Sequence, residues 1–133
     1  MAKDVTSEKL ACVIARVLDD KLGKNLVILN ISKVSVLADY FVVCSADTST
    51  QVRALSSYVR EKIKDAFERL PDNYENDARN RWNLLDYGDV VVHIMHREER
   101  ETYAIEKFWN HAFTVPEDVW MEQSKEFAEY SQV

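Results

Sequence analysis

Three histidines and one glutamate have side chains that could hold a metal ion. His93 and His96 lie near the end of a strand-like run, where they could meet His111 or Glu99 as zinc ligands. The spacing is weak evidence, because no cysteine stands at ligand spacing and the two histidines leave the run in different directions. A hydrogen-bonded histidine in an interface explains His93 better. We therefore expect no metal site and no cofactor.

The two cysteines lie inside apolar patterns rather than in reactive surroundings. Cys12 falls within the run from Ala11 to Ile14, and Cys44 follows the run from Phe41 to Val43. Reduced thiols that fill the core, in a reducing compartment, are the simplest interpretation. The sequence shows no Ser-His-Asp or Cys-His order with a recognisable nucleophile turn. Hydrolytic chemistry is therefore set aside, and we expect a protein that is not an enzyme.

The composition indicates an acidic protein with one folded domain. The chain has 133 residues, of which 47% are hydrophobic, and its net charge is −6. The basic residues are scattered, which argues against a direct nucleic-acid site and favours a basic protein as partner. The first nine residues contain no apolar signal segment, and no run approaches the roughly 20 apolar residues of a membrane span. We expect a cytoplasmic protein that does not bind membranes.

Apolar periodicity predicts helices and strands that could position these residues. Thr6 or Ser7 caps a first helix that ends near Gly23, and Thr48 begins a second helix that ends before Pro71. The tail after Pro116 is expected to form a short amphipathic helix. The other expected elements are strands over 26–31 and 40–45, a loop over 71–81 that could hold a short edge strand, strands over 82–87 and 90–95, and a helix over 97–111 with Ile105, Phe108, Trp109 and Ala112 facing inward.

This order of elements predicts an α/β (α+β) fold with a mixed sheet of about five strands flanked by helices. Residues 1–112 are expected to form a single domain. Residues 113–133 form a C-terminal extension in which Val119, Trp120 and Phe127 would supply the apolar side of the short helix.

The two strands around Gly88 and Asp89 are expected to form a hairpin, because a two-residue connection containing glycine favours one. Strand pairing then places opposite residues on the same face. The first face carries Asn83, Leu85, Tyr87, Val90, Val92 and Ile94 and should pack on helices, and the second face carries Trp82, Leu84, Asp86, Val91, His93 and Met95.

The second face has the composition of a protein-binding surface. Trp82 and Met95 supply apolar contact area, while Asp86 and His93 would fix the orientation of a partner. An equally good interpretation is that a helix of the same chain covers this face, since large exposed apolar patches are unusual on monomers. A shift of one residue in the pairing would exchange the two faces. Both interpretations stay open from composition alone.

Two segments resemble the ribosomal silencing factor (Iojap-like) family. They are ADYFVVCSADTSTQVRALSSYVREKI over 38–63 and WNLLDYGDVVVHIMHREERETYAIEKFW over 82–109. The second is the more specific, because the tryptophan, the Asp-Tyr-Gly-Asp turn, the Val-Val-Val-His strand and the Tyr-x-Ile-Glu-x-x-Trp helix occur in one fixed order.

The resemblance implies a homodimer with a nucleotidyltransferase-like fold. It also implies binding to the large ribosomal subunit through its fourteenth ribosomal protein, a basic protein on the intersubunit face, and a steric block to joining of the small subunit. The residues expected to bind this partner are Trp82, Leu84, Asp86, Val91, His93 and Met95. Residues that match the family motif and are expected to have structural roles are Asp39, Tyr40 (also a candidate for the dimer seam), Gly88, Asp89, Tyr103, Glu106 and Trp109.

Two features of this sequence bear on the resemblance. Relatives often carry a glycine after the Cys-Thr or Cys-Ser pair, whereas this chain has Ala46 and Asp47. Either the turn differs or Asp47 takes an unusual backbone conformation. The implied fold also raises the alternative of a nucleotidyltransferase, but its carboxylate cluster and glycine-rich loop are missing from a sequence with only two glycines. A generic dimeric adaptor is the remaining alternative.

Overall fold

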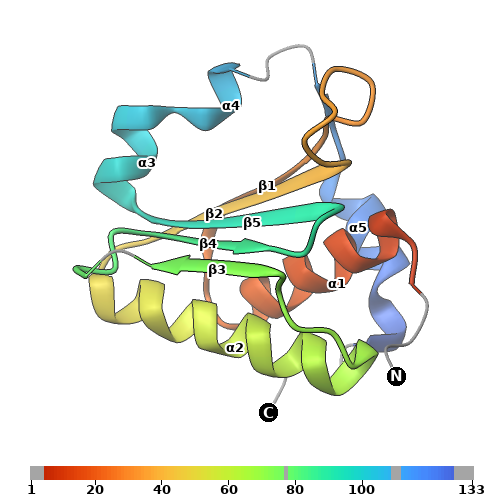
Figure 1. Cartoon of the computed structure of the whole chain (residues 1–133), viewed down its shortest axis with the longest axis horizontal. Coiled ribbons are helices and arrows are strands. Elements are labelled where there is room, and N and C mark those ends of the chain that lie inside the picture. Colours follow the sequence, from red (N-terminus) through yellow and green to blue (C-terminus); the bar gives the residue numbers. More distant parts are fainter. Residues whose placement is uncertain (1–4, 77, 109–111, 128–133) are drawn as a thin grey trace.

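The computed structural model describes residues 5–76, 78–108 and 112–127. One sheet lies between helices: α1, α2 and α5 cover its first face, and α3 and α4 lie over its second face (Figure 1). The elements are α1 (Ser7–Asp20), β1 (Lys24–Asn30), β2 (Tyr40–Ala46), α2 (Ser49–Phe67), β3 (Asn73–Asn76), β4 (Trp82–Asp86), β5 (Val90–His96), α3 (Arg97–Tyr103), α4 (Ile105–Phe108), β6 (Phe113–Thr114), α5 (Glu117–Gln123) and the 3-10 turn η1 (Lys125–Phe127).

The sheet is mixed and six-stranded, with the order β3-β4-β5-β2-β1-β6. Strands β2 and β5 pair in parallel at its centre, and every other neighbouring pair is antiparallel. The expected mixed sheet between helices is therefore confirmed, with six strands rather than about five. The edge strands that periodicity marked least clearly are β3, inside the expected loop, and the two-residue β6.

Capping residues set the starts of the two long helices. The hydroxyl oxygen of Thr6 accepts a hydrogen bond from the backbone N–H of Lys9, and that of Thr48 accepts one from Gln51. Both N-caps confirm the sequence prediction. The Gln51 side chain does not close a capping box, because its amide donates instead to the carbonyl of Leu22.

The first face of the sheet carries the larger core. Leu85, Val92 and Ile94 from the hairpin are fully buried against the two long helices, as expected. Asn83 is the polar exception at 0% exposure, and its amide donates to the hydroxyl of Ser56 on α2 at 3.0 Å. This contact, and a second from the same amide to Asn80 Oδ1 at 3.2 Å, satisfy the donors of Asn83, while its buried Oδ1 has no partner among the described residues.

The hairpin has the register that was predicted. Trp82 lies opposite Met95, Leu84 opposite His93 and Asp86 opposite Val91, so these side chains share the second face. Gly88 in the turn has φ +91°, a backbone conformation that favours glycine, and its N–H donates to Asp86 Oδ1.

The expected helix over 97–111 is interrupted, which corrects the prediction. Ala104 has φ +44° and its N–H donates to the carbonyl of Arg100, so α3 ends there and α4 begins at Ile105. The change of direction brings Ile105 onto the second face, where it is 7% exposed. A straight amphipathic helix would need one continuous apolar stripe along its length. The break at Ala104 lets two short helices bury their apolar residues on the sheet without such a stripe. Trp109 and His111 lie outside the described residues.

Residues after Ala112 pack on the same body. Strand β6 pairs with β1, and Trp120 on α5 is 3% exposed within the first-face core. The Arg16 guanidinium on α1 donates to the carbonyl of Met121 and to the hydroxyl of Ser124. The short helix predicted after Pro116 is confirmed, although Val119 is exposed rather than inward.

The loop that leaves β2 contains no unusual backbone angle. Neither Ala46 nor Asp47 has a positive φ, so the turn differs from one that needs glycine. Asp47 forms an ion pair with Lys24.

Among the described helices, none combines the length and apolar character that a bilayer crossing demands.

We predict that Gly88→Ala destabilises the fold by about 1–2 kcal/mol, because alanine is strained at this φ and its Cβ would lie 3.2 Å from Asp72 Oδ2. Urea unfolding followed by circular dichroism measures the change. Glu68→Gly is the matched control, since Glu68 has φ +56° at the end of α2. It should not destabilise, and an unchanged stability for Gly88→Ala would contradict the strain argument.

Candidate partner-binding site

The six residues predicted to bind a partner share the second face but differ in exposure. Trp82, Leu84 and Asp86 lie on β4 and are half-buried. The other three lie on the central strand β5, where Val91 is 9%, His93 6% and Met95 0% exposed. The chain itself therefore covers β5 on this face, while β4 retains accessible surface.

His93 holds the Trp82 side chain in place. The indole Nε1–H donates to His93 Nδ1 at 3.2 Å, and the imidazole packs edge-on against Phe41 with ring centroids 4.8 Å apart. Burial lowers the pKa of His93 to about 4, so its ring is neutral at physiological pH and Nδ1 can accept the hydrogen bond. The orientation of the tryptophan therefore depends on an uncharged histidine.

Tyr103 on α3 extends the surface beyond the hairpin. Its ring lies 4.9 Å from that of Trp82, and Tyr103 is 52% exposed. Two aromatic side chains from distant parts of the sequence therefore form a pair with one accessible side. We call Trp82, Leu84, Asp86 and Tyr103 the hairpin surface. Tyr103 was expected only as a structural residue, and no local sequence signal relates it to Trp82.

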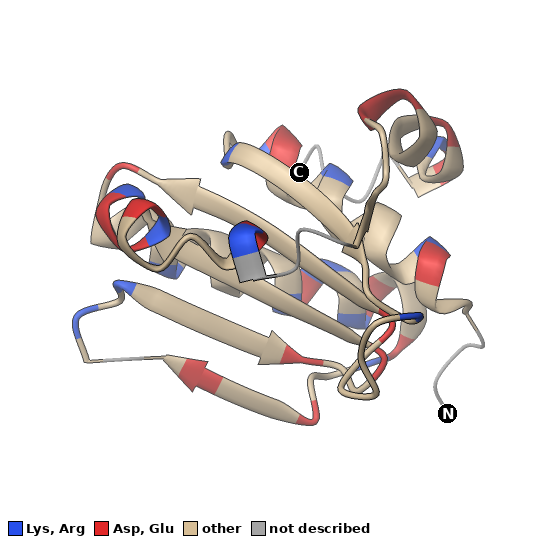
Figure 2. Cartoon of the chain, turned by 90° about the horizontal axis from the view of Figure 1, so that it is seen from above, with Lys and Arg blue, Asp and Glu red and all other residues tan. Residues whose placement is uncertain are grey.

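Strand β3 adds an acidic border that sequence analysis missed. Glu75 pairs with Leu84 and Asn73 pairs with Asp86, so these β3 side chains share the second face. The Asn73 amide donates to Glu75 at 3.0 Å. In the view onto this face, acidic residues lie on β3 and at the end of β4, and basic residues lie on the loop that joins these two strands (Figure 2). The edge beside Leu84 is therefore negatively charged.

The candidate zinc ligands are occupied by a different interaction. His96, Glu98 and Glu99 have ligand atoms within 4.8 Å of one another. The Arg81 guanidinium, however, binds Glu98 at 2.6 Å and Glu99 at 2.7 Å, and these hydrogen bonds lower the pKa of both carboxyls. His96 Nδ1 accepts from the backbone N–H of Glu98 as the cap of α3. The two ion pairs with Arg81 account for the close approach of Glu98 and Glu99.

The motif residues at the hairpin turn join three elements. Ser7 Oγ lies 3.0 Å from Asp39 Oδ2 and 2.9 Å from Asp89 Oδ2, and Arg69 at the end of α2 binds Asp89. The backbone N–H groups of Asp39 and Tyr40 donate to the carbonyl of Asp89. This network ties the start of α1 and the entry to β2 to the turn. The Tyr40 side chain is 8% exposed in the first-face core.

The cysteines are core residues. Burial raises the pKa of the Cys12 thiol to about 11 and that of Cys44 to about 12. Neither thiol is ionised near pH 7, so neither is an activated nucleophile.

Glu106 binds the Arg100 guanidinium at 2.9 Å, which agrees with a structural role.

We predict that acidification destabilises the fold through His93. Its folded pKa lies below the ordinary value of 6.5, so its stabilising contribution is full above pH 6.5 and is lost as the pH falls towards 4. Between pH 7.5 and pH 5 the free energy of unfolding should drop by about 2 kcal/mol from this residue. Urea titrations of the wild type and of His93→Gln test this, and equal slopes in the two proteins would contradict it.

Comparisons with known proteins place the chain among relatives of this architecture. The family model "Ribosomal silencing factor during starvation" matches residues 4–132. A ribosomal silencing factor from Halalkalibacterium halodurans is 34% identical over 114 residues, covering 84% of this chain and 94% of the relative. One from Bacillus subtilis is 32% identical over 111 residues, covering 84% and 93%.

The fold agrees with solved structures of similar sequence. A crystal structure of a Chromobacterium violaceum protein superposes with a TM-score of 0.76 at 32% identity, covering 80% of this chain and 88% of that one. The match of the family model to nearly the whole chain and the agreement in fold lead to the same conclusion. The chain belongs to the ribosomal silencing factor family.

Proposed function

We propose that this protein silences translation by binding the large ribosomal subunit and preventing the small subunit from joining. Family membership supports association with the ribosome. The observation that carries the mechanism is the hairpin surface, where Trp82 packs at a tilt against Tyr103, is hydrogen-bonded to His93 and is only half-buried. The proposed contact is the fourteenth protein of the large subunit, on the intersubunit face.

The six predicted residues would have two different roles in binding. Trp82, Leu84 and Asp86 would touch the partner, because they retain accessible surface. Val91, His93 and Met95 would support them from beneath, since they are nearly or fully buried. Buried neighbours restrict the rotamers of an aromatic side chain before binding, which reduces the entropy lost on association. Aromatic residues that are already oriented in this way are typical binding hot spots.

The charge of the surface favours a basic partner. Asp86 and Glu75 border Leu84 on the second face, and the whole chain carries a net charge of −6. Complementary charge speeds encounter and fixes the relative orientation of two proteins. Ribosomal proteins are commonly basic, so the acidic border agrees with the proposed target.

We further propose that the protein works by binding alone, in the cytoplasm. A steric block needs a bound body and no chemistry. In the described residues the thiols are un-ionised at neutral pH, and the histidines His93 and His96 accept hydrogen bonds within the fold. These roles leave them poorly suited to catalysis.

We also propose a homodimer in solution. Exposed apolar side chains gather on the loop between β1 and β2 and on β6, the strand beside β1. They are Val34 at 47%, Val36 at 103%, Leu37 at 71% and Phe113 at 66% exposure. A second copy would remove such surface from water.

The experiment that tests the function is sedimentation of purified large and small subunits in associating magnesium, with and without the protein. We expect the protein to migrate with free large subunits and the peak of whole ribosomes to fall. If the protein remains at the top of the gradient and association is unchanged, the silencing proposal fails and a non-ribosomal adaptor becomes the better interpretation.

We predict that Trp82→Ala weakens binding to large subunits by about 2 kcal/mol or more, which is about 30-fold, because an aromatic hot spot is lost. Binding of fluorescently labelled protein to purified subunits measures this. Leu70→Ala is the control, because Leu70 is an apolar residue with 57% exposure that belongs neither to the hairpin surface nor to the proposed dimer surface. Circular dichroism checks folding: a Trp82→Ala variant that unfolds would assign Trp82 to the core instead.

A further inference from the structure

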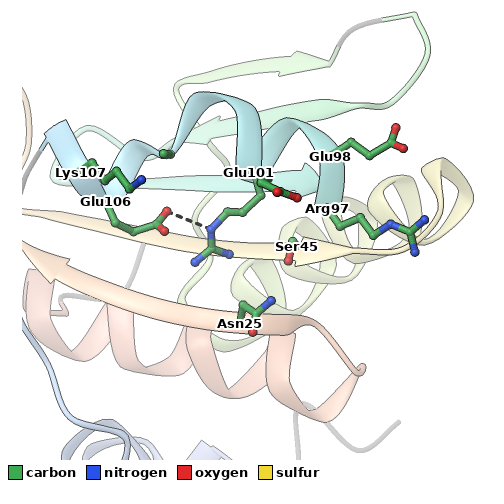
Figure 3. Close-up of a pocket in the computed structure, with 9 residues that line it drawn as sticks. Asn25, Ser45, Arg97, Glu98, Glu101, Glu106 and Lys107 are labelled. Carbon is green, nitrogen blue, oxygen red and sulfur yellow. Dashed lines mark hydrogen bonds and ion pairs between the residues drawn. The ribbon is translucent and has the colours of Figure 1, made fainter.

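A pocket of about 470 Å³ lies between the second face of the sheet and helices α3 and α4 (Figure 3). It shares no residue with the hairpin surface. Its lining comes from the first residues of β1, the end of β2 and both helices: Asn25, Ser45, Arg97, Glu98, Arg100, Glu101, Ala104, Glu106 and Lys107.

Two departures from regular backbone form this pocket. Asn25 has φ +52°, and the pairing of β1 with β2 shifts register between Lys24 and Val27. Ala104 has φ +44° and separates α3 from α4 above the sheet. Residues other than glycine cost free energy in this conformation, and such positions concentrate at functional sites. Both lie in the lining of the same pocket.

Arg100 lines the pocket, and its guanidinium is only partly hydrogen-bonded. It is 9% exposed, and its Nε donates to Glu106 Oε1 at 2.9 Å. Its Nη1 is buried and has no hydrogen-bond partner within the described part of the chain. A buried donor of a charged group without an acceptor costs more than 1 kcal/mol. The guanidinium therefore lines the pocket with one donor unused, and this nitrogen is enclosed by protein atoms that a ligand would have to displace.

The pocket lining combines hydrogen-bond donors with three carboxylates, those of Glu98, Glu101 and Glu106, of which Glu101 is exposed. Asn25 and Ser45 lie on the strands beneath α3, and Lys107 lies beside Glu106 (Figure 3). Glu98 points out of the pocket, where it binds Arg81 at 2.6 Å. The carboxylate of Glu106 is already bound to Arg100.

We propose that this pocket binds a small molecule through an oxyanion, a carboxylate or a phosphate, placed on the Nη side of Arg100. A guanidinium matches the planar geometry of such groups and binds them with charge-assisted hydrogen bonds. The Asn25 amide and the Lys107 ammonium supply further donors. The pocket volume falls within the range of about 300–1,000 Å³ typical of small-molecule sites, so it holds more than a bare ion.

The site also has a physical connection to α3. Arg100 and Tyr103 belong to this one helix, whose end is set by the hydrogen bond from the Ala104 N–H to the Arg100 carbonyl. A ligand on Arg100 would restrain the helix that carries Tyr103. The proposal itself stands apart from ribosome binding and can be tested without ribosomes.

The test is a titration of the full-length, isotope-labelled protein with inorganic phosphate and, separately, with malonate. Amide and arginine Nε signals are followed by NMR. We expect saturable shifts at Asn25, Arg100 and Lys107 with a dissociation constant below about 10 mM for at least one probe. The probe that binds more tightly identifies the ligand as a phosphate or a carboxylate. Shifts that spread over the surface without saturating for both probes would overturn the proposal.

Asn25→Gly is the discriminating variant, because glycine accepts the φ of +52° while removing the amide. It should weaken the preferred probe about 10-fold, as expected for a lost hydrogen bond to a charged group. Asn80→Gly is the matched control, since Asn80 also has φ +52° but lies outside the pocket. Equal affinities of the two variants would overturn the proposal. Arg100→Met should abolish binding of the probe. If Arg100→Met does not fold, Lys107→Gln takes its place in the binding measurement, because Lys107 is at an exposed position.

Discussion

The parallel pairing of β2 with β5 at the centre of the sheet is the constraint on which the rest of the structure depends. Both strands are buried along their whole length, so both faces of the sheet must be covered. Parallel strands also require a long crossover, which α2 provides, because no tight turn can join them. The helices α1 and α2 cover the first face, and α3 and α4 cover part of the second. The incomplete cover of the second face leaves β4 accessible, and with it the hairpin surface.

Local patterns predicted the parts of the fold that local chemistry determines. The hairpin register followed from a two-residue turn containing Gly88 and from residue alternation, because one face had to be apolar. The caps at Thr6 and Thr48 were predictable for a similar reason, since each satisfies a backbone donor within three residues. These interactions are nearly independent of the remaining chain.

Long-range geometry accounts for what could not be predicted. Nothing near Tyr103 in the sequence indicates that α3 ends at Ala104 and brings its ring onto Trp82. The place of Glu75 beside Leu84 depends on the pairing of an edge strand that sequence patterns barely mark. The candidate surface was therefore predicted as a set of hairpin residues, while its division into an accessible row on β4 and a buried row on β5 required the tertiary structure.

The parallel pairing also has a consequence for how the chain acquires its shape during synthesis. Tyr40 pairs with Val90, so the two central strands are separated by α2, β3 and β4. Contacts between residues so far apart in the sequence slow folding, because the intervening chain must lose conformational entropy before the strand pairing can stabilise the fold. A nascent chain cannot complete its sheet until β5 has left the exit tunnel. The hairpin surface therefore forms only after most of the chain has been synthesised.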